Sequence, residues 1–169
     1  MLKRTYKLCL ILVVLISTAG CDQVTKRVAK SELISAPPVS LLRNVVRLEY
    51  TENPGAFMSF GENLPKPVLP IIVSILFAVV IFALLRLIVR NKRVRPALMI
   101  ALSLLAGGSA GNLIDRVVNK GVVIDFVSLG IGPLRTGIFN LADLAVMAGA
   151  LLLVFVTFTE GQRRSKETA

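Results

Sequence analysis

Aspartate is scarce in this chain, and its positions suggest where chemistry takes place. Among 169 residues there are four aspartates, each at or near the edge of an apolar run: Asp22, Asp115, Asp125 and Asp143. Asp143 lies a few residues inside the apolar run 138–158, where an ionisable group is costly and therefore marks a functional site by default. Asn140 precedes it by three positions, so both side chains project from one helical face.

A second carboxyl could complete a catalytic pair with Asp143. Asp125 lies in the apolar stretch 122–126, which is too short to span a membrane and predicts an extended or re-entrant piece. Two carboxyls that lie close together share a proton, which is what a water-activating aspartic protease needs. The spacing alone leaves the pairing open, and a buried contact of Asp143 with Arg116 or Arg135 is the structural alternative.

Other kinds of catalysis are excluded by composition. The chain has no His, so Ser-His-Asp, Cys-His and His-ligated zinc mechanisms cannot operate. Cys9 and Cys21 are too few and too poorly spaced for a disulfide framework or a metal knuckle.

Further polar residues surround the apolar run 97–114. Gly107 and Gly111 form a Gly-x-x-x-Gly pattern, which favours close helix packing. The side chains of Asn112, Asp115 and Arg116 share one helical face, as either a capped helix end with an ion pair or a substrate-orienting group. Asp22 and Lys26 have the i, i+4 spacing of a supporting ion pair on a helix surface.

Composition and hydropathy predict lipid as the surrounding solvent. Hydrophobic residues make up 54% of the chain, and its mean hydropathy is +0.74. We predict an all-α integral membrane protein, in which residues 1–169 form a single domain with four transmembrane helices. The predicted spans are about 8–28, 68–89, 97–114 and 138–158.

The basic residues predict the orientation of these spans. The net charge of +10 comes from clusters beside the apolar runs, which favours membrane anchoring and argues against nucleic acid as a partner. Four spans would place all the clusters and both termini in the cytoplasm, with loops of about 29–67 and 115–137 facing outward. Apolar and charged residues alternate over 46–50, which predicts a strand and a small β-sheet on the outer membrane surface.

The polar segments together resemble the lipoprotein signal peptidases, also called signal peptidase II. The matching stretches occur in the family's order: DQVTK at 22–26, NPGA at 53–56, GGSAGNLIDR at 107–116, VIDF at 123–126 and FNLAD at 139–143.

The resemblance implies a fold and an activity. It implies four transmembrane helices with a small periplasmic β-sheet cradle, and an aspartic endopeptidase with Asp125 and Asp143 as its catalytic pair. The site-supporting positions that it implies are Asp22, Lys26, Asn53, Gly55, Asn112, Asp115, Arg116, Asn140 and Ala142.

The resemblance also implies partners and a location. The substrates would be diacylglyceryl-modified prolipoproteins, cut just before the lipidated Cys, and globomycin-type cyclic peptides would inhibit. We expect no cofactor and no metal, contact with membrane lipids, a monomer, and a place in the bacterial inner membrane with the site toward the periplasmic or outer face. The family commonly has Ala-Phe-Ser after Ala56, whereas this chain has Phe57-Met58-Ser59, so its fine specificity stays open.

Two rival interpretations use the same residues. A small transporter or channel subunit would line an ion path with intramembrane Asp, Asn and Arg. A lipoprotein precursor would end its signal peptide at Thr18-Ala19-Gly20-Cys21. Thr18 is atypical for that motif, and the further apolar spans are unlike a soluble mature lipoprotein.

Overall fold

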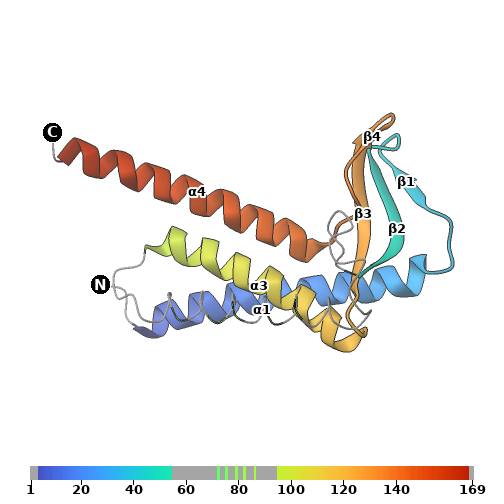
Figure 1. Cartoon of the computed structure of the whole chain (residues 1–169), viewed down its shortest axis with the longest axis horizontal. Coiled ribbons are helices and arrows are strands. Elements are labelled where there is room, and N and C mark those ends of the chain that lie inside the picture. Colours follow the sequence, from blue (N-terminus) through green and yellow to red (C-terminus); the bar gives the residue numbers. More distant parts are fainter. Residues whose placement is uncertain are drawn as a thin grey trace.

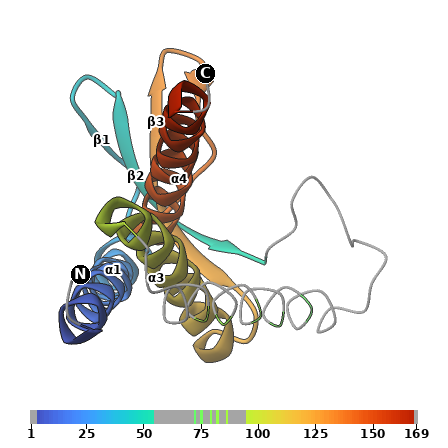
Figure 2. The same cartoon turned by 90° about the vertical axis from the view of Figure 1, so that its left-hand side faces the viewer.

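The computed structural model describes residues 4–54 and 95–167, together with positions 72, 75, 79, 82 and 86. Within these residues, three long helices run side by side, and a small sheet stands at one end of them (Figure 1). The sheet crosses one end of the helices, so the molecule has a helical part and a β part that meet at one junction (Figures 1 and 2).

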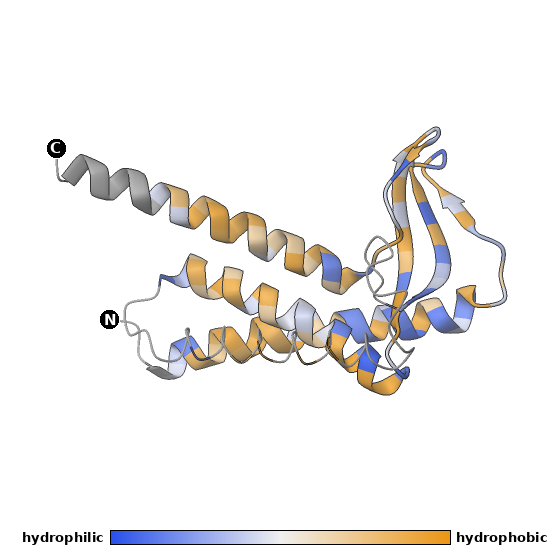
Figure 3. Cartoon of the chain, viewed as in Figure 1, coloured by the Kyte–Doolittle hydropathy of each residue, from blue (hydrophilic) through white to orange (hydrophobic). Residues whose placement is uncertain are grey.

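The three helices are long and apolar enough to cross a membrane. Helix α1 spans Arg4–Leu33, α3 spans Pro96–Val118 and α4 spans Leu141–Glu167. Pro96 suits the first turn of α3, because the N–H that proline lacks would have no partner inside the helix. The hydropathy colouring shows apolar residues along most of each helix and polar residues near the sheet (Figure 3). These are the surfaces that a bilayer requires.

Helix α3 lies between the other two and is the most buried of the three spans. Its glycines permit this close contact. A Cβ atom on Gly108 would lie 2.5 Å from the backbone oxygen of Ala142 in α4, and one on Gly111 would lie 2.6 Å from Oδ2 of Asp22 in α1. The small residues in this helix therefore bring α1 and α4 against its polar end.

The sheet is antiparallel, with the order β1-β2-β3-β4. Its strands are β1 (Val39–Leu41), β2 (Val46–Asn53), β3 (Val123–Ile131) and β4 (Leu134–Arg135). Val46 pairs with Leu129, and Asn53 pairs with Val123. This register places the end of β2 beside the start of β3, directly above the polar end of α3.

The predicted fold class is wrong. The described residues contain three candidate spans rather than four, and a four-stranded sheet that an all-α class omits. The sheet also takes two strands from residues 123–135, which the sequence pattern places in a separate loop. The sequence pattern fails here because the pairing of two segments about 80 residues apart leaves no local signal. The predicted span 68–89 lies outside the described residues, apart from five isolated positions.

Candidate active site

The two aspartates proposed from sequence lie on different elements that meet at the junction of sheet and helices. Asp125 is the third residue of β3 and is only 2% exposed. Asp143 lies in the first turn of α4. The chain passes from β3 through β4 to Asn140, and the isolated bridge between Val127 and Phe139 brings this return beside the start of β3.

A capping box holds Asp143 at the start of α4. The backbone N–H of Asp143 donates to Oδ1 of Asn140 (2.9 Å), and the backbone N–H of Asn140 donates to Oδ2 of Asp143 (3.1 Å). The reciprocal pair satisfies two backbone donors that a helix start otherwise leaves without partners. It also places the carboxyl where the helix dipole favours negative charge.

Three asparagines connect the two carboxyls. The side-chain amide of Asn140 donates to Oδ1 of Asp125 (2.6 Å), and that of Asn53 donates to Oδ2 of Asp125 (2.9 Å). The amide of Asn112 donates to Oδ1 of Asp143 (2.8 Å). Asn140 also donates to Oδ1 of Asn112 (3.1 Å), which closes the connection between the aspartates.

Burial and a neighbouring charge raise the pKa of Asp125. Removal of the carboxyl from water is the larger cause, and the negative charge of Asp143 adds to it. Hydrogen bonds from Asn53 and Asn140 act in the opposite direction, and the resulting pKa of Asp125 is about 6. A carboxyl with this pKa is partly protonated near neutral pH, so it can give a proton as well as accept one.

A buried ion triad lies behind the asparagines. Nζ of Lys26 is 2.8 Å from Oδ2 of Asp22 and 2.9 Å from Oδ2 of Asp115, and it donates to Oδ1 of Asn112 (2.9 Å). The three charged residues are at most 2% exposed. The expected surface pair of Asp22 and Lys26 is therefore wrong in its setting: the pair is buried because α3 covers it.

Both carboxylates of the triad also hold backbone groups next to the proposed catalytic residues. Oδ2 of Asp115 accepts from the backbone N–H of Ile124 (3.0 Å), which precedes Asp125. Oδ1 of Asp22 accepts from the backbone N–H of Ala142 (2.8 Å), which precedes Asp143. One ammonium thus lies between two carboxylates, each of which binds the chain one residue before an aspartate of the pair.

Of the remaining predicted site residues, some lie near the two carboxyls and others lie outside the described residues. Arg116 lies on α3 within electrostatic reach of Asp115, Asp125 and Asp143. Gly55 lies outside the described residues, as do Phe57 and Met58. The alternative partner proposed for Asp143, Arg135, instead donates to the backbone oxygens of Asn44 (2.8 Å) and Ser128 (3.3 Å).

One residue of the cluster was missed. The amide of Gln23 donates to Oδ1 of Asp115 (2.7 Å) and to the backbone oxygen of Gly111 (3.2 Å). Its spacing of three from Lys26 is compatible with a shared helical face, which was the available signal. Among the described residues, no group of three or more His, Cys, Asp or Glu has the arrangement of a metal site.

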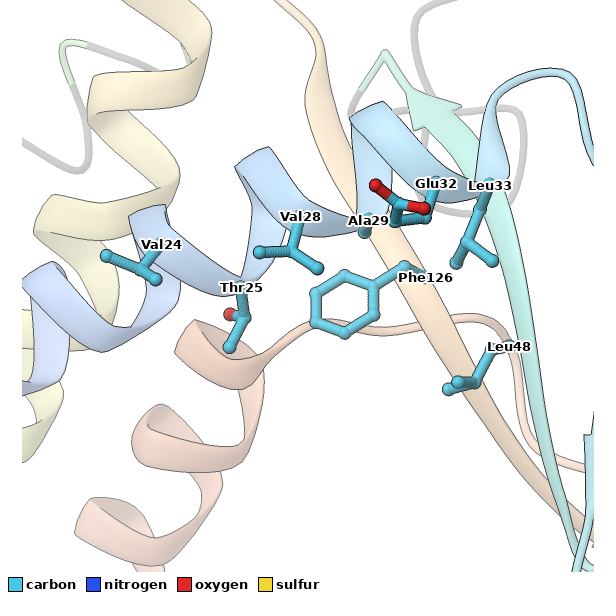
Figure 4. Close-up of a pocket in the computed structure, with 8 residues that line it drawn as sticks. All are labelled: Val24, Thr25, Val28, Ala29, Glu32, Leu33, Leu48 and Phe126. Atoms are coloured by element: carbon cyan, nitrogen blue, oxygen red, sulfur yellow. The ribbon is translucent and has the colours of Figure 1, made fainter.

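An apolar groove is lined in part by Phe126, the residue after Asp125 (Figure 4). It has a volume of about 390 Å³ and lies between the last turns of α1 and the strands β2 and β3. Phe126, the residue after Asp125, points toward α1 in the groove (Figure 4). The lining residues are Val24, Thr25, Val28, Ala29, Glu32, Leu33, Leu48 and Phe126.

The three apolar helices, each long enough to cross a membrane, define the class of the protein as a membrane protein. Two solved structures, each described as a bacterial membrane enzyme obtained by the in meso method, share its fold. The one at 2.3 Å resolution has a TM-score of 0.77 and 22% identity, over 90% of each chain. The one at 1.9 Å resolution has a TM-score of 0.74 and 25% identity, over 87% of this chain and 91% of the other.

The sequence comparisons give the family. The family model for signal peptidase (SPase) II matches residues 11–159, so the chain belongs to the signal peptidase II family, and it is a bacterial membrane protein. A lipoprotein signal peptidase of Caldicellulosiruptor bescii is 37% identical over 88% of this chain and 91% of its own length. One of Moorella thermoacetica is 32% identical over 86% and 91% respectively.

Proposed function

We propose that this protein is an aspartic endopeptidase that removes the signal peptide from diacylglyceryl-modified prolipoproteins. Cleavage occurs at the peptide bond before the lipidated Cys. The observation that carries the proposal is the hydrogen-bonded arrangement of Asp125 and Asp143 around Asn140, at the end of three helices able to span a membrane. Family membership supplies the substrate class.

Asp143 acts as the general base in this mechanism. It accepts hydrogen bonds from Asn112 and from the backbone of Asn140 at the start of α4, and these bonds fix the position of its carboxyl. It takes a proton from a water molecule placed between the carboxyls. The water oxygen then attacks the carbonyl carbon of the scissile bond.

Asp125 acts as the general acid. Its pKa is raised to about 6, so a fraction of the Asp125 carboxyls is protonated near neutral pH. The protonated carboxyl donates to the carbonyl oxygen and thereby stabilises the tetrahedral intermediate. As the peptide bond breaks, the proton taken by Asp143 passes to the leaving amine, and a hydroxyl of the intermediate returns its proton to Asp125. The asparagines keep the two carboxyls aligned, and this orientation supplies much of the rate.

The groove and the helices place the substrate. The scissile bond of a lipid-modified precursor must reach water while its acyl chains remain in the bilayer. The carboxyls lie where the helices meet the sheet, and the groove that Phe126 lines gives apolar groups of the precursor a surface. We also propose that the protein acts as a monomer and that globomycin-type cyclic peptides block this site.

The decisive experiment measures cleavage of a diacylglyceryl-modified prolipoprotein by the purified wild type, Asp125→Asn and Asp143→Asn. Asn keeps the size and polarity of Asp but cannot exchange the proton, so each variant should lose roughly 10²–10⁴-fold in kcat. Glu49→Gln on β2 is the matched control for loss of a carboxylate elsewhere, and it should cleave at the wild-type rate. Near-normal turnover by either Asp variant would reject the mechanism. An inactive wild type would reject the substrate class.

A further inference from the structure

The far end of the sheet carries exposed apolar side chains in and beside its two turns. The β1–β2 and β3–β4 connections meet there, and we call the segments 41–45 and 129–135 the sheet tip. Leu42 is 74% exposed, Ile131 is 79% exposed and Leu134 is 81% exposed. Leu42 lies in the β1–β2 turn, where Gly, Asn, Asp or Ser is usual, and Ile131 and Leu134 flank the β3–β4 turn. An exposed group of large apolar side chains marks a surface that contacts something other than water.

Hydrogen bonds fix the two segments of the sheet tip to each other. The backbone N–H of Gly130 donates to the oxygen of Val45 (2.9 Å), and the Arg135 guanidinium donates to the oxygen of Asn44 (2.8 Å). These bonds join the two turns to each other. Leu42 has a φ of 51°, a region in which a bulky residue is rare and strained. The fold therefore holds this apolar side chain outward against a conformational cost.

The position of the tip identifies what lies beside it. The strands run across the helix ends, and the tip lies to one side of α1 and α3 (Figures 1 and 2). Because the three helices are of membrane-spanning length, a sheet across their ends lies at the membrane surface. A tip that extends sideways from helices at that level lies over lipid.

The charges of the tip fit the same partner. Its two segments contain Arg43 and Arg135 and no acidic residue. Apolar side chains next to arginines match the boundary between acyl chains and anionic headgroups. On these grounds we propose that the sheet tip is a lipid-binding surface. Leu42, Ile131 and Leu134 insert into the acyl region of the leaflet next to the sheet, and Arg43 binds an anionic phospholipid headgroup.

The absence of Trp from the sequence makes a direct test possible, because one introduced Trp reports without background. We would place it at the tip as Leu134→Trp. Leu151→Trp, at an exposed position in the α4 span, is the lipid reference, and Ser35→Trp, in the exposed α1–β1 connection, is the water reference. Each full-length variant is reconstituted in vesicles of phosphatidylcholine and phosphatidylglycerol. Quenching is measured with acyl-brominated lipids and with aqueous iodide.

The proposal predicts that the Leu134→Trp fluorophore is quenched by brominated lipid about as strongly as that of Leu151→Trp, and is shielded from iodide. Brominated phosphatidylglycerol should quench it more than brominated phosphatidylcholine, and Arg43→Gln should remove that difference. Because Trp itself favours the interface, Leu42→Ser with Ile131→Ser is added in the same background and should weaken the lipid quenching.

Two results would overturn the proposal. Iodide quenching equal to that of Ser35→Trp, without quenching by brominated lipid, would place the tip in water. Shielding from both quenchers would mean that a second copy or another protein covers it. Neither result depends on peptidase activity, so failure of this inference is distinct from failure of the proposed function.

Discussion

At the scale of single residues, Asp125 links the chemistry of the site to the stability of the fold. Its pKa of about 6 lies above the ordinary value of 3.8 for an aspartate in an unfolded chain. Between these values the folded state binds more protons than the unfolded state does. The contribution of Asp125 to stability is therefore fully present below about pH 4, and it is lost as the pH rises toward 6.

The replacement Asp125→Asn should consequently stabilise the protein near neutral pH while it abolishes turnover. Its side chain is uncharged at every pH, so the melting temperature of the variant minus that of the wild type should increase from pH 4 to pH 6 and then stay constant. The limiting difference corresponds to at most about 3 kcal/mol. Circular dichroism melts in detergent at a fixed scan rate measure it. A difference that does not change with pH would show that the pKa of Asp125 in the fold is ordinary.

The sequence predicts which residues form the candidate site, but it does not predict the contacts between them. The scarcity of Asp, the lack of His and the apolar residues around Asp125 and Asp143 make these two the candidates for catalysis. The sequence does not show that the amide of Asn140 reaches Asp125 while its backbone caps α4 with Asp143. Asn140 contacts both β3 and α4, whereas spacing along the chain indicates only which residues are neighbours on the same helix.

At the scale of elements, the ion triad determines how α1, α3, β3 and α4 meet. Lys26 lies between Asp22 and Asp115. Those carboxylates accept hydrogen bonds from the backbone N–H groups of Ala142 and Ile124 respectively. Burial of the three charges does not by itself stabilise the fold, since proteins in which apolar residues replace a buried ion triad are often equally stable. The arrangement is better explained by position, because it relates the chain before Asp143 to the chain before Asp125.

This role predicts different effects on stability and on catalysis. Lys26→Met leaves two buried carboxylates without their cation and should destabilise the fold by about 3–5 kcal/mol. Adding Asp22→Asn and Asp115→Asn removes the uncompensated charge. Each Asn keeps one oxygen that can accept from the backbone N–H of Ala142 or Ile124, so the melting temperature should largely recover. The triple variant should nevertheless lose roughly tenfold or more in kcat, with little change in KM, because the two backbone segments are held less firmly.

The pH profile of kcat separates this role from simple charge loss. Loss of a nearby charge moves both limbs of the profile in the same direction, whereas a changed distance between two coupled carboxyls changes the gap between the limbs. The charged groups that face Asp125 are Asp143 on α4, Arg116 on α3 and Lys26 on α1. Lys30→Met, one turn further along α1 at an exposed position, is the matched control. A triple variant with wild-type kcat and an unchanged gap would remove the triad from the mechanism.

The helices were more predictable than the sheet for a physical reason. The apolar runs 97–114 and 138–158 are long local signals, and α3 and α4 contain most of their residues. The alternation over 46–50 likewise lies within β2. Besides β1, β2 pairs with β3, and the sequence near these two strands carries no signal for that second pairing. The error in fold class therefore came from contacts between distant segments, which also assemble the site.

At the scale of the whole molecule, the buried polar site and the basic residues that flank the spans lie at opposite ends of the helices. Apart from Ser103, the buried polar side chains of the described helices lie toward the sheet. The far end holds the start of α1, the start of α3 and the end of α4 (Figure 1). Arg4, Lys7 and Arg95 lie there, and Arg163 and Arg164 lie near the end of α4. Such a distribution suits a site at one membrane surface better than a transport path, which would need polar groups through the full depth.

The same asymmetry predicts which side of the membrane the site faces. Basic residues flanking spans are retained in the cytoplasm, so the sheet, the groove and the carboxyls should face outward, in the bacterial inner membrane. Ser35→Cys, in a background with Cys9→Ala and Cys21→Ala, should be labelled in intact spheroplasts by a thiol reagent that cannot cross the membrane. A cysteine at Arg95→Cys should be labelled only after the cells are opened. Labelling of the second position alone in intact spheroplasts would reverse the orientation, and the peptidase could then not meet precursors whose mature part has crossed the membrane.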